Sequence, residues 1–204
     1  MLGSIPNTIH TLWIGSPIPD KLQRLVDSIP RYCPTFHHKI WRDEEVRTLP
    51  TFGKLALECE PKALGCDLAR AEIIHREGGI FVDADMELTH GLDYARKYPV
   101  ILTEENHGPC LSACFYGAVA GHPLAKDYME RLQAYVGRND IHNPKVYPRN
   151  GAATGRMLLR HAQKATGSWV RFIIRNDQKG QRWFVIDRNN YNVVGIHYAE
   201  GTWK

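Results

Sequence analysis

The fold is decided by one segment, Cys66–Leu88, which reads C-D-L-A-R-A-E-I-I-H-R-E-G-G-I-F-V-D-A-D-M-E-L. Its first half repeats apolar residues at the spacing of a helix face, and these are Leu68, Ala69, Ile73 and Ile74. Gly78 and Gly79 then predict the end of this helix, because glycine readily takes the left-handed conformation found there. The apolar run Ile80–Val82 that follows predicts a short buried strand.

Two carboxylates, those of Asp83 and Asp85, follow this strand. Side chains two residues apart on a strand share one face, so the two carboxylates are expected to converge on one point. A buried carboxylate needs a charged partner, since unpaired burial is costly, and Mg²⁺ or Mn²⁺ suits oxygen ligands. An isolated Asp-x-Asp triplet is more often a turn or a solvated edge. The rest of the chain therefore has to decide between the two interpretations.

The segments before this one alternate between strand and helix patterns. We expect a strand at Ile9–Ile14, a helix at Lys21–Ile29 capped by Asp20, a strand at His37–Trp41, and short helices at Asp43–Leu49 and Phe52–Cys59. This alternation predicts an α/β fold with a mainly parallel central sheet flanked by helices. Ligands of such sheets bind beyond the C-terminal ends of the strands, where Trp13, Ile14 and the Asp83–Asp85 pair would lie together.

The segments after the aspartates continue the mixture of strands and helices. We expect a surface segment at Glu87–Asp93, strands at Val100–Thr103 and Leu111–Ala120, a helix opened by the Gly121-His122-Pro123 turn, a loop at Gly137–Asn150, a helix at Ala152–Ala165, and a hairpin of Val170–Ile174 with Trp183–Ile186. A chain of 204 residues with this pattern is expected to form one domain over residues 1–204.

Composition narrows the class of protein. With 43% hydrophobic and 24% charged residues, the chain has the balance of a soluble globular protein. A net charge of +4 allows an anionic substrate without requiring nucleic acid or membrane. The five cysteines are odd in number and include no C-x-x-C pair, which favours a reducing compartment over a disulfide framework. No signal peptide and no apolar run of membrane-spanning length is visible, so we expect a cytoplasmic protein.

The ordered run D-L-x-R-x-x-I-I-x-x-x-G-G-I-F-V-D-x-D at Asp67–Asp85 resembles the sugar-nucleotide segment of the DXD glycosyltransferases. The nearest groups are family 32, which includes initiating mannosyltransferases and capsular polysaccharide transferases, and the catalytic domain of the large clostridial glucosylating toxins. Two further segments match in the same order, I-H-x-x-W-I-G at Ile9–Gly15 and I-H-Y-A-E-G-T-W at Ile196–Trp203. The resemblance implies a GT-A fold and transfer of a sugar from a UDP- or GDP-linked donor to a hydroxyl acceptor, such as a saccharide or glycoconjugate.

The resemblance also implies a metal site. Asp85 would be a direct ligand of Mn²⁺ or Mg²⁺, His197 would complete the site, and Asp83 would touch the metal through water while reaching the ribose or donor sugar. One imidazole among oxygen ligands favours Mn²⁺ slightly.

Other residues would bind the donor by the same resemblance. Asp67 and Arg70 would hydrogen-bond the sugar hydroxyls, with Arg70 also near the diphosphate, for which a planar and permanently charged guanidinium is suited. Trp13 and Ile14 would cradle the nucleotide base, and Thr202 and Trp203 would close over the diphosphate.

The resembling families retain the anomeric configuration of the sugar. The carboxylates available as a covalent nucleophile are Glu104, Glu105 and Glu200, and none of them stands in a motif. We therefore expect attack on the face from which the phosphate departs, with no protein nucleophile.

Two other interpretations stay open. Haloacid-dehalogenase-like phosphatases also place Asp-x-Asp after an apolar strand, but their pattern has Thr or Val where Glu87 stands. A nucleic-acid-associated module, or a glycosyltransferase that modifies DNA, could use the mildly basic balance and the Trp and Tyr residues. The spread of lysines and arginines along the chain, without a dense cluster, argues against nucleic acid.

Overall fold

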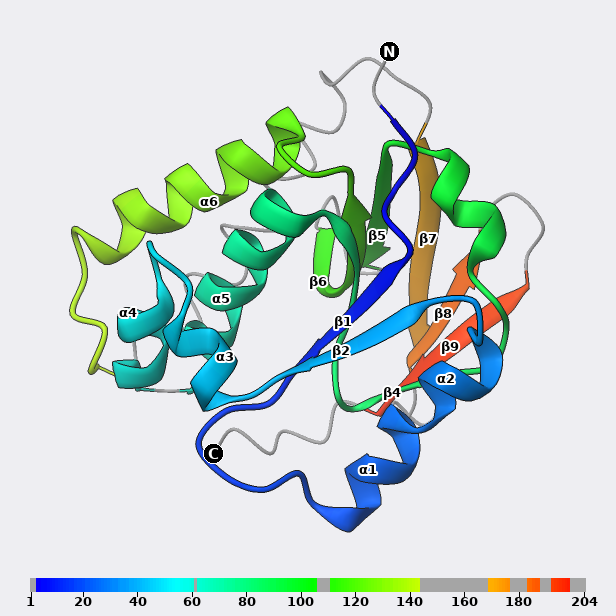
Figure 1. Cartoon of the computed structure of the whole chain (residues 1–204), viewed down its shortest axis with the longest axis horizontal. Helices are drawn as coiled ribbons and strands as arrows, with labels where there is room; N and C mark the ends of the chain where they lie inside the picture. Colours follow the sequence, from blue (N-terminus) through cyan, green and yellow to red (C-terminus); the bar gives the residue numbers. More distant parts are fainter. Residues whose placement is uncertain are drawn as a thin grey trace.

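The computed structural model describes residues 3–60, 62–105, 111–143, 169–176, 183–187 and 192–198. These residues form one nine-stranded sheet with helices packed against it (Figure 1). The strands are β1 (Thr8–Leu12), β2 (His37–Trp41), β3 (Gly79–Val82), β4 (Met86–Leu88), β5 (Val100–Glu105), β6 (Leu111–Ala118), β7 (Trp169–Asn176), β8 (Trp183–Asp187) and β9 (Val193–His197). The helices are α1 (Asp20–Val26), α2 (Ser28–Tyr32), α3 (Asp43–Arg47), α4 (Gly53–Glu58), α5 (Lys62–Glu77), α6 (Pro123–Val136) and a 3₁₀ helix η1 (Asp93–Lys97).

The order of strands across the sheet is β2-β1-β3-β6-β5-β7-β8-β9-β4. The predicted α/β class is confirmed. Parallel pairing holds for the block β2–β1–β3 and for β5–β7, whereas the other neighbours are antiparallel. The C-terminal ends of β1, β2 and β3 therefore lie at one edge of the sheet, as the sequence indicated.

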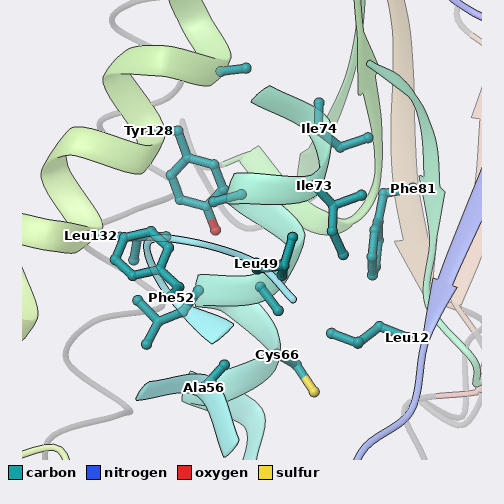
Figure 2. Close-up of a cluster of buried hydrophobic side chains, with 14 of the residues drawn as sticks. Leu12, Leu49, Phe52, Ala56, Cys66, Ile73, Ile74, Phe81, Tyr128 and Leu132 are labelled. Atoms are coloured by element: carbon teal, nitrogen blue, oxygen red, sulfur yellow. The ribbon is translucent and has the colours of Figure 1, made fainter. Parts of the chain in front are cut away.

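Strand β3 is buried on both faces, which explains its continuous apolar sequence. Phe81 points into a core shared with α5 and α6, while Ile80 and Val82 point into a second core on the opposite face. Figure 2 shows Phe81 facing Ile73 of α5, and Tyr128 of α6 packing on the other side of α5. The second core includes Leu92 and Ala95 at η1 and Ile29 of α2. The strand that precedes the aspartates is thus held rigidly from both sides.

The single helix predicted over Lys21–Ile29 is wrong, because the structure splits it into α1 and α2 at Asp27. Pro30 explains the break. In a continuous helix its ring would clash with the carbonyl of Val26, whereas in α2 it lies in the first turn, where its missing N–H is not needed. The predicted N-cap is also wrong, since Pro19 is the capping residue and Asp20 is the first residue of α1.

The surface segment predicted at Glu87–Asp93 is wrong as well. Met86, Leu88 and Leu92 are fully buried in the second core, and Met86–Leu88 forms strand β4. A strand of three residues is too short to show a periodicity in sequence. The hairpin predicted near residues 170–186 is confirmed as the antiparallel pair β7–β8, and Pro123 opens α6 as expected. The helix predicted at 152–165 lies outside the described residues.

Four of the five cysteines, Cys33, Cys59, Cys66 and Cys114, are described, and all four are buried free thiols. Among the described residues, no helix combines the length and apolar character needed to cross a membrane.

His10 lies at the centre of β1 with no exposed surface, and both ring nitrogens are hydrogen-bonded. The indole N–H of Trp41 donates to His10 Nδ1 at 3.0 Å, so the proton sits on Nε2, which donates to the Gly78 carbonyl at 2.9 Å. This network fixes His10 in its neutral form and explains its place in the core. Burial lowers the pKa of His10 from 6.5 to about 4.

The pKa of His10 predicts a loss of stability in mild acid. The folded-state pKa of His10 is below its unfolded value, so the stability it contributes is complete above about pH 6.5 and is lost as the pH falls toward about 4. Urea unfolding of the His10→Gln variant should show a weaker dependence on pH over this window, by up to about 3 kcal/mol, because glutamine can replace both hydrogen bonds without titrating. The matched control is His37→Gln at an exposed position of β2. An unchanged pH dependence in His10→Gln would contradict the assignment.

Candidate metal and donor site

The two aspartates lie in a tight turn between β3 and β4. The Asp83 amide donates to the Cys114 carbonyl of β6 at 2.9 Å, and the Met86 amide donates to the Asp83 carbonyl at 3.0 Å. The side chains of Asp83 and Asp85 converge as predicted, although they do so from a turn and not from a continuous strand.

His197 reaches this turn because β4 pairs with β9. Met86 is opposite His197 in the antiparallel register, and the Tyr198 amide donates to the Asp85 carbonyl at 3.0 Å. The imidazole Nε2 of His197 lies 3.1 Å from Asp85 Oδ1. One ligand atom each from Asp83, Asp85 and His197 falls within 4.8 Å of the others. The structure therefore brings together the three residues that the sequence assigned to a metal.

These three residues fit a divalent cation by their chemistry. Two carboxylate oxygens and one imidazole nitrogen form a donor set suited to Mn²⁺ or Mg²⁺. Burial raises the pKa of Asp83 to about 7, although the adjacent Arg70 acts to lower it. Burial acts to lower the pKa of His197, but the hydrogen bond and negative charge of Asp85 outweigh this and raise it. A bound cation would compensate the charge of the two buried carboxylates in their ionised form.

Arg70 occupies the buried space between α5 and the aspartate turn. Its Nη1 donates to the Ala113 carbonyl at 2.7 Å and lies 3.0 Å from Asp83 Oδ1. Its Nε lies 3.5 Å from Asp67 Oδ1, one helical turn earlier, and the guanidinium lies over the Phe81 ring at 4.8 Å from the centroid. Arg70 is therefore held by groups of this chain on several sides. The predicted contacts of Asp67 and Arg70 with a donor sugar stay predictions.

Trp13 and Ile14 follow β1 at the same edge of the sheet, but both are buried. Trp13 is 4% exposed, packs in a cluster with Ala84 and Tyr198, and donates from Nε1 to Ser16 Oγ at 3.2 Å. The position of Trp13 beside Ala84, which separates the two aspartates, places it next to the site. Its stacking on a nucleotide base stays a prediction.

Several other sequence-assigned residues cannot be compared with the structure. Thr202, Trp203 and Glu200 lie outside the described residues. The sequence did not single out Tyr198, or Glu87 as a partner for it, although the structure joins their side chains beside the site. The adjacency of Tyr198 to His197 was visible, but the register of β4 with β9 was not.

Comparisons with known proteins confirm the resemblance to glycosyltransferases. Inositol phosphoceramide mannosyltransferase 3 of Schizosaccharomyces pombe is 25% identical over 138 residues, covering 65% of this chain and 38% of that protein. Inositol phosphoceramide mannosyltransferase 1 of the same organism is 22% identical over 155 residues, covering 70% and 47%. An uncharacterised glycosyltransferase of Acanthamoeba polyphaga mimivirus is 29% identical over 90 residues, covering 40% and 36%. The match thus spans less than half the length of each relative. No protein-family model matches the chain.

Solved structures show that the fold is one that glycosyltransferase domains adopt. The PaToxG glycosyltransferase superposes with a TM-score of 0.59 at 16% identity, covering 78% of this chain and 70% of that chain. The ligand-free glycosyltransferase domain from the YGT toxin superposes with a TM-score of 0.50 at 8% identity, covering 66% and 64%. The fold class inferred from the sequence is therefore confirmed by shared architecture.

The buried ion pair of Arg70 and Asp83 makes a testable prediction about stability. Replacing Arg70 by Met should lower the free energy of unfolding by about 3 kcal/mol or more, because Asp83 is then left buried without its cation. The double variant R70M/D83N should recover part of that loss, which urea unfolding at neutral pH measures.

The matched control for this ion pair is Arg131→Met, which removes an exposed pair with Asp127 on α6 and should cost about 1 kcal/mol or less. Equal destabilisation in R70M and in R70M/D83N would show that the two residues do not act as a pair.

Proposed function

We propose that this chain is a divalent-cation-dependent glycosyltransferase that moves a sugar from a UDP- or GDP-linked donor to a hydroxyl group of a glycan or glycoconjugate. The observation that carries the proposal is the convergence of Asp83, Asp85 and His197 within 4.8 Å, on a fold shared with glycosyltransferase domains. His197 is distant in sequence from the two aspartates, and the resemblance assigns all three residues to one site.

In this proposal Asp85 and His197 are the direct metal ligands and Asp83 lies between the metal and the donor. Bound Mn²⁺ or Mg²⁺ would neutralise the negative charge that develops on the departing diphosphate. Arg70 holds Asp83 in place through the contact of 3.0 Å and supplies permanent positive charge near the diphosphate. Asp67, beside Arg70, would accept hydrogen bonds from the sugar hydroxyls.

The nucleoside would lie over the end of β1, next to Trp13 and Ile14. Since Trp13 is 4% exposed, base stacking would need a rearrangement of its side chain or of a covering segment. Thr202 and Trp203 would close over the diphosphate. The hydrogen bond from the Tyr198 amide to the Asp85 carbonyl supports this assignment, because it holds the chain at the metal site only four residues before Thr202.

We further propose that the sugar keeps its anomeric configuration, and that the acceptor attacks the face from which the phosphate leaves. Glu104 lies at the end of β5, and β6 separates β5 from β3. Two strand spacings place its backbone about 10 Å or more from the aspartate turn. That distance argues against Glu104 as a nucleophile under a sugar bound at Asp83. The leaving phosphate would then accept the proton of the acceptor hydroxyl.

The names of the relatives suggest where to begin with substrates. Two of them are inositol phosphoceramide mannosyltransferases, so a mannosyl donor and an acceptor that carries a phosphoinositol headgroup come first. Glucosyl, galactosyl and N-acetylated donors linked to UDP follow. This order of testing concerns only the identity of the donor and the acceptor. The proposed metal site is the same whichever donor is used.

The proposed function is tested by donor hydrolysis across UDP- and GDP-sugars with Mn²⁺. The chain should release nucleotide from one donor, and EDTA should abolish the release. Asp85→Asn should reduce the rate of release at least about 100-fold, because the metal loses a charged ligand. Glu77→Gln, which removes an exposed carboxylate paired with Lys39, is the control and should keep full rates.

The same reaction with an acceptor allows NMR to identify the anomer of the product, and an inverted product would contradict retention. Absence of both hydrolysis and binding for all donors would refute the function.

A further inference from the structure

Tyr198, the residue after His197, contacts the aspartate segment at two points. Its backbone N–H donates to the Asp85 carbonyl at 3.0 Å. Its phenol hydroxyl donates to Glu87 Oε2 at 2.7 Å. One residue of the C-terminal segment is therefore joined to the residue that would bind the metal and to the residue two positions beyond it.

The strand register explains how the side chains meet. Glu87 is opposite Ile196 in the antiparallel pair β4–β9, so Tyr198 is its diagonal neighbour on the same face. Diagonal neighbours lie about 7–8 Å apart at their Cα atoms, which a tyrosine and a glutamate together can span. A shorter hydroxyl side chain at position 198 would leave the Glu87 carboxylate out of reach.

The ring of Tyr198 is part of the hydrophobic cluster that contains Trp13 and Ala84. Ala84 lies between the two aspartates in sequence, and Trp13 follows β1. Packing fixes the ring, and the hydroxyl is thereby directed at Glu87. This cluster connects the three segments of the candidate site, which are the end of β1, the aspartate turn and the end of β9.

His197 and Asp85 both need such support. His197 is the last residue of β9, and strand ends open more easily than strand interiors. Asp85 lies in a turn whose backbone lacks the regular ladder of a sheet. A metal site binds tightly when its ligands are already held in the binding geometry, and groups behind the ligands supply that order.

We propose that Tyr198 and Glu87 form a positioning pair that holds His197 and Asp85 at the separation needed to bind a divalent cation. The proposal rests on the proposed function, since it concerns the same metal site. Neither residue is a ligand in this proposal. The Glu87 carboxylate accepts the tyrosine hydrogen bond, and the three-residue ligand cluster found among the described residues does not include it.

The test is a titration of the whole chain with Mn²⁺ alone, followed by the EPR signal of free Mn²⁺. Tyr198→Phe removes the hydroxyl and keeps the ring in its cluster, and Glu87→Gln removes the charge of the acceptor. Each should weaken Mn²⁺ binding about tenfold, as the loss of groups behind metal ligands does. The double variant should bind Mn²⁺ about as tightly as the single variant with the lower affinity, because both substitutions break the same hydrogen bond.

Two controls separate positioning from folding. Tyr32→Phe removes the hydroxyl of a tyrosine that is 38% exposed on α2, and it should leave Mn²⁺ affinity unchanged. The melting temperature of metal-free Tyr198→Phe should match that of the parent, so a purely structural role would appear as a lowered melting temperature with unchanged affinity. That outcome would overturn the proposal, and Glu87→Gln gives a second measure of affinity if Tyr198→Phe folds poorly.

Asp85→Asn distinguishes failure of this proposal from failure of the proposed function. If the parent binds Mn²⁺ and Asp85→Asn does not, the metal site stands, and parent-like affinity in Tyr198→Phe and Glu87→Gln overturns the positioning pair alone. If the parent does not bind Mn²⁺, the metal site and the positioning pair both fail.

Discussion

The need to compensate buried carboxylates organises this molecule. Asp83 and Asp85 follow a strand that is packed on both faces, so water cannot solvate them fully, and each lies beside a cationic group or one that can become cationic. Arg70 of α5 serves Asp83, and His197 of β9 serves Asp85. By contrast, the buried carboxylate of Glu72 on α5 accepts hydrogen bonds from the backbone amides of Thr51 and Phe52, at 2.9 and 2.7 Å. Arg70 and His197 lie far from each other in sequence, and the fold brings both to the aspartate turn.

The need to compensate these carboxylates also relates the fold to the proposed chemistry. A site rich in negative charge at the C-terminal edge of β1, β2 and β3 suits a divalent cation, and a cation there suits a diphosphate. Arg70 adds positive charge that does not depend on pH, while His197 can either pair with Asp85 or bind metal. Glycosyltransferase domains share this architecture, and the chain spans less than half the length of the curated relatives that it matches.

The parts of the fold that the sequence predicted are those with local patterns. Helix α5, which leads into β3, carries a clear apolar spacing and ends at Glu77, directly before Gly78, whose φ of 66° is in the left-handed region. The break between α1 and α2 was also open to prediction, since proline is tolerated in the first turn of a helix but not in its interior. The pairing of β4 with β9 could not be predicted, because the three residues of β4 are too few to show a periodicity and their partner strand is far along the chain. His197 was assigned to the site by the resemblance to glycosyltransferases, whereas the contact of Tyr198 with Glu87 depends on the register of β4 with β9 and was not predicted.

We propose above that Asp85 and His197 bind one divalent cation together. Pulsed EPR of the Mn²⁺-loaded chain tests it most directly, because a coordinated imidazole gives a nitrogen modulation of the Mn²⁺ echo. We expect this modulation in the parent chain and its loss in His197→Ala, with weak residual Mn²⁺ binding through the carboxylates. Mn²⁺ bound without nitrogen modulation, or with modulation that persists in His197→Ala, would show that His197 is not a ligand of the cation.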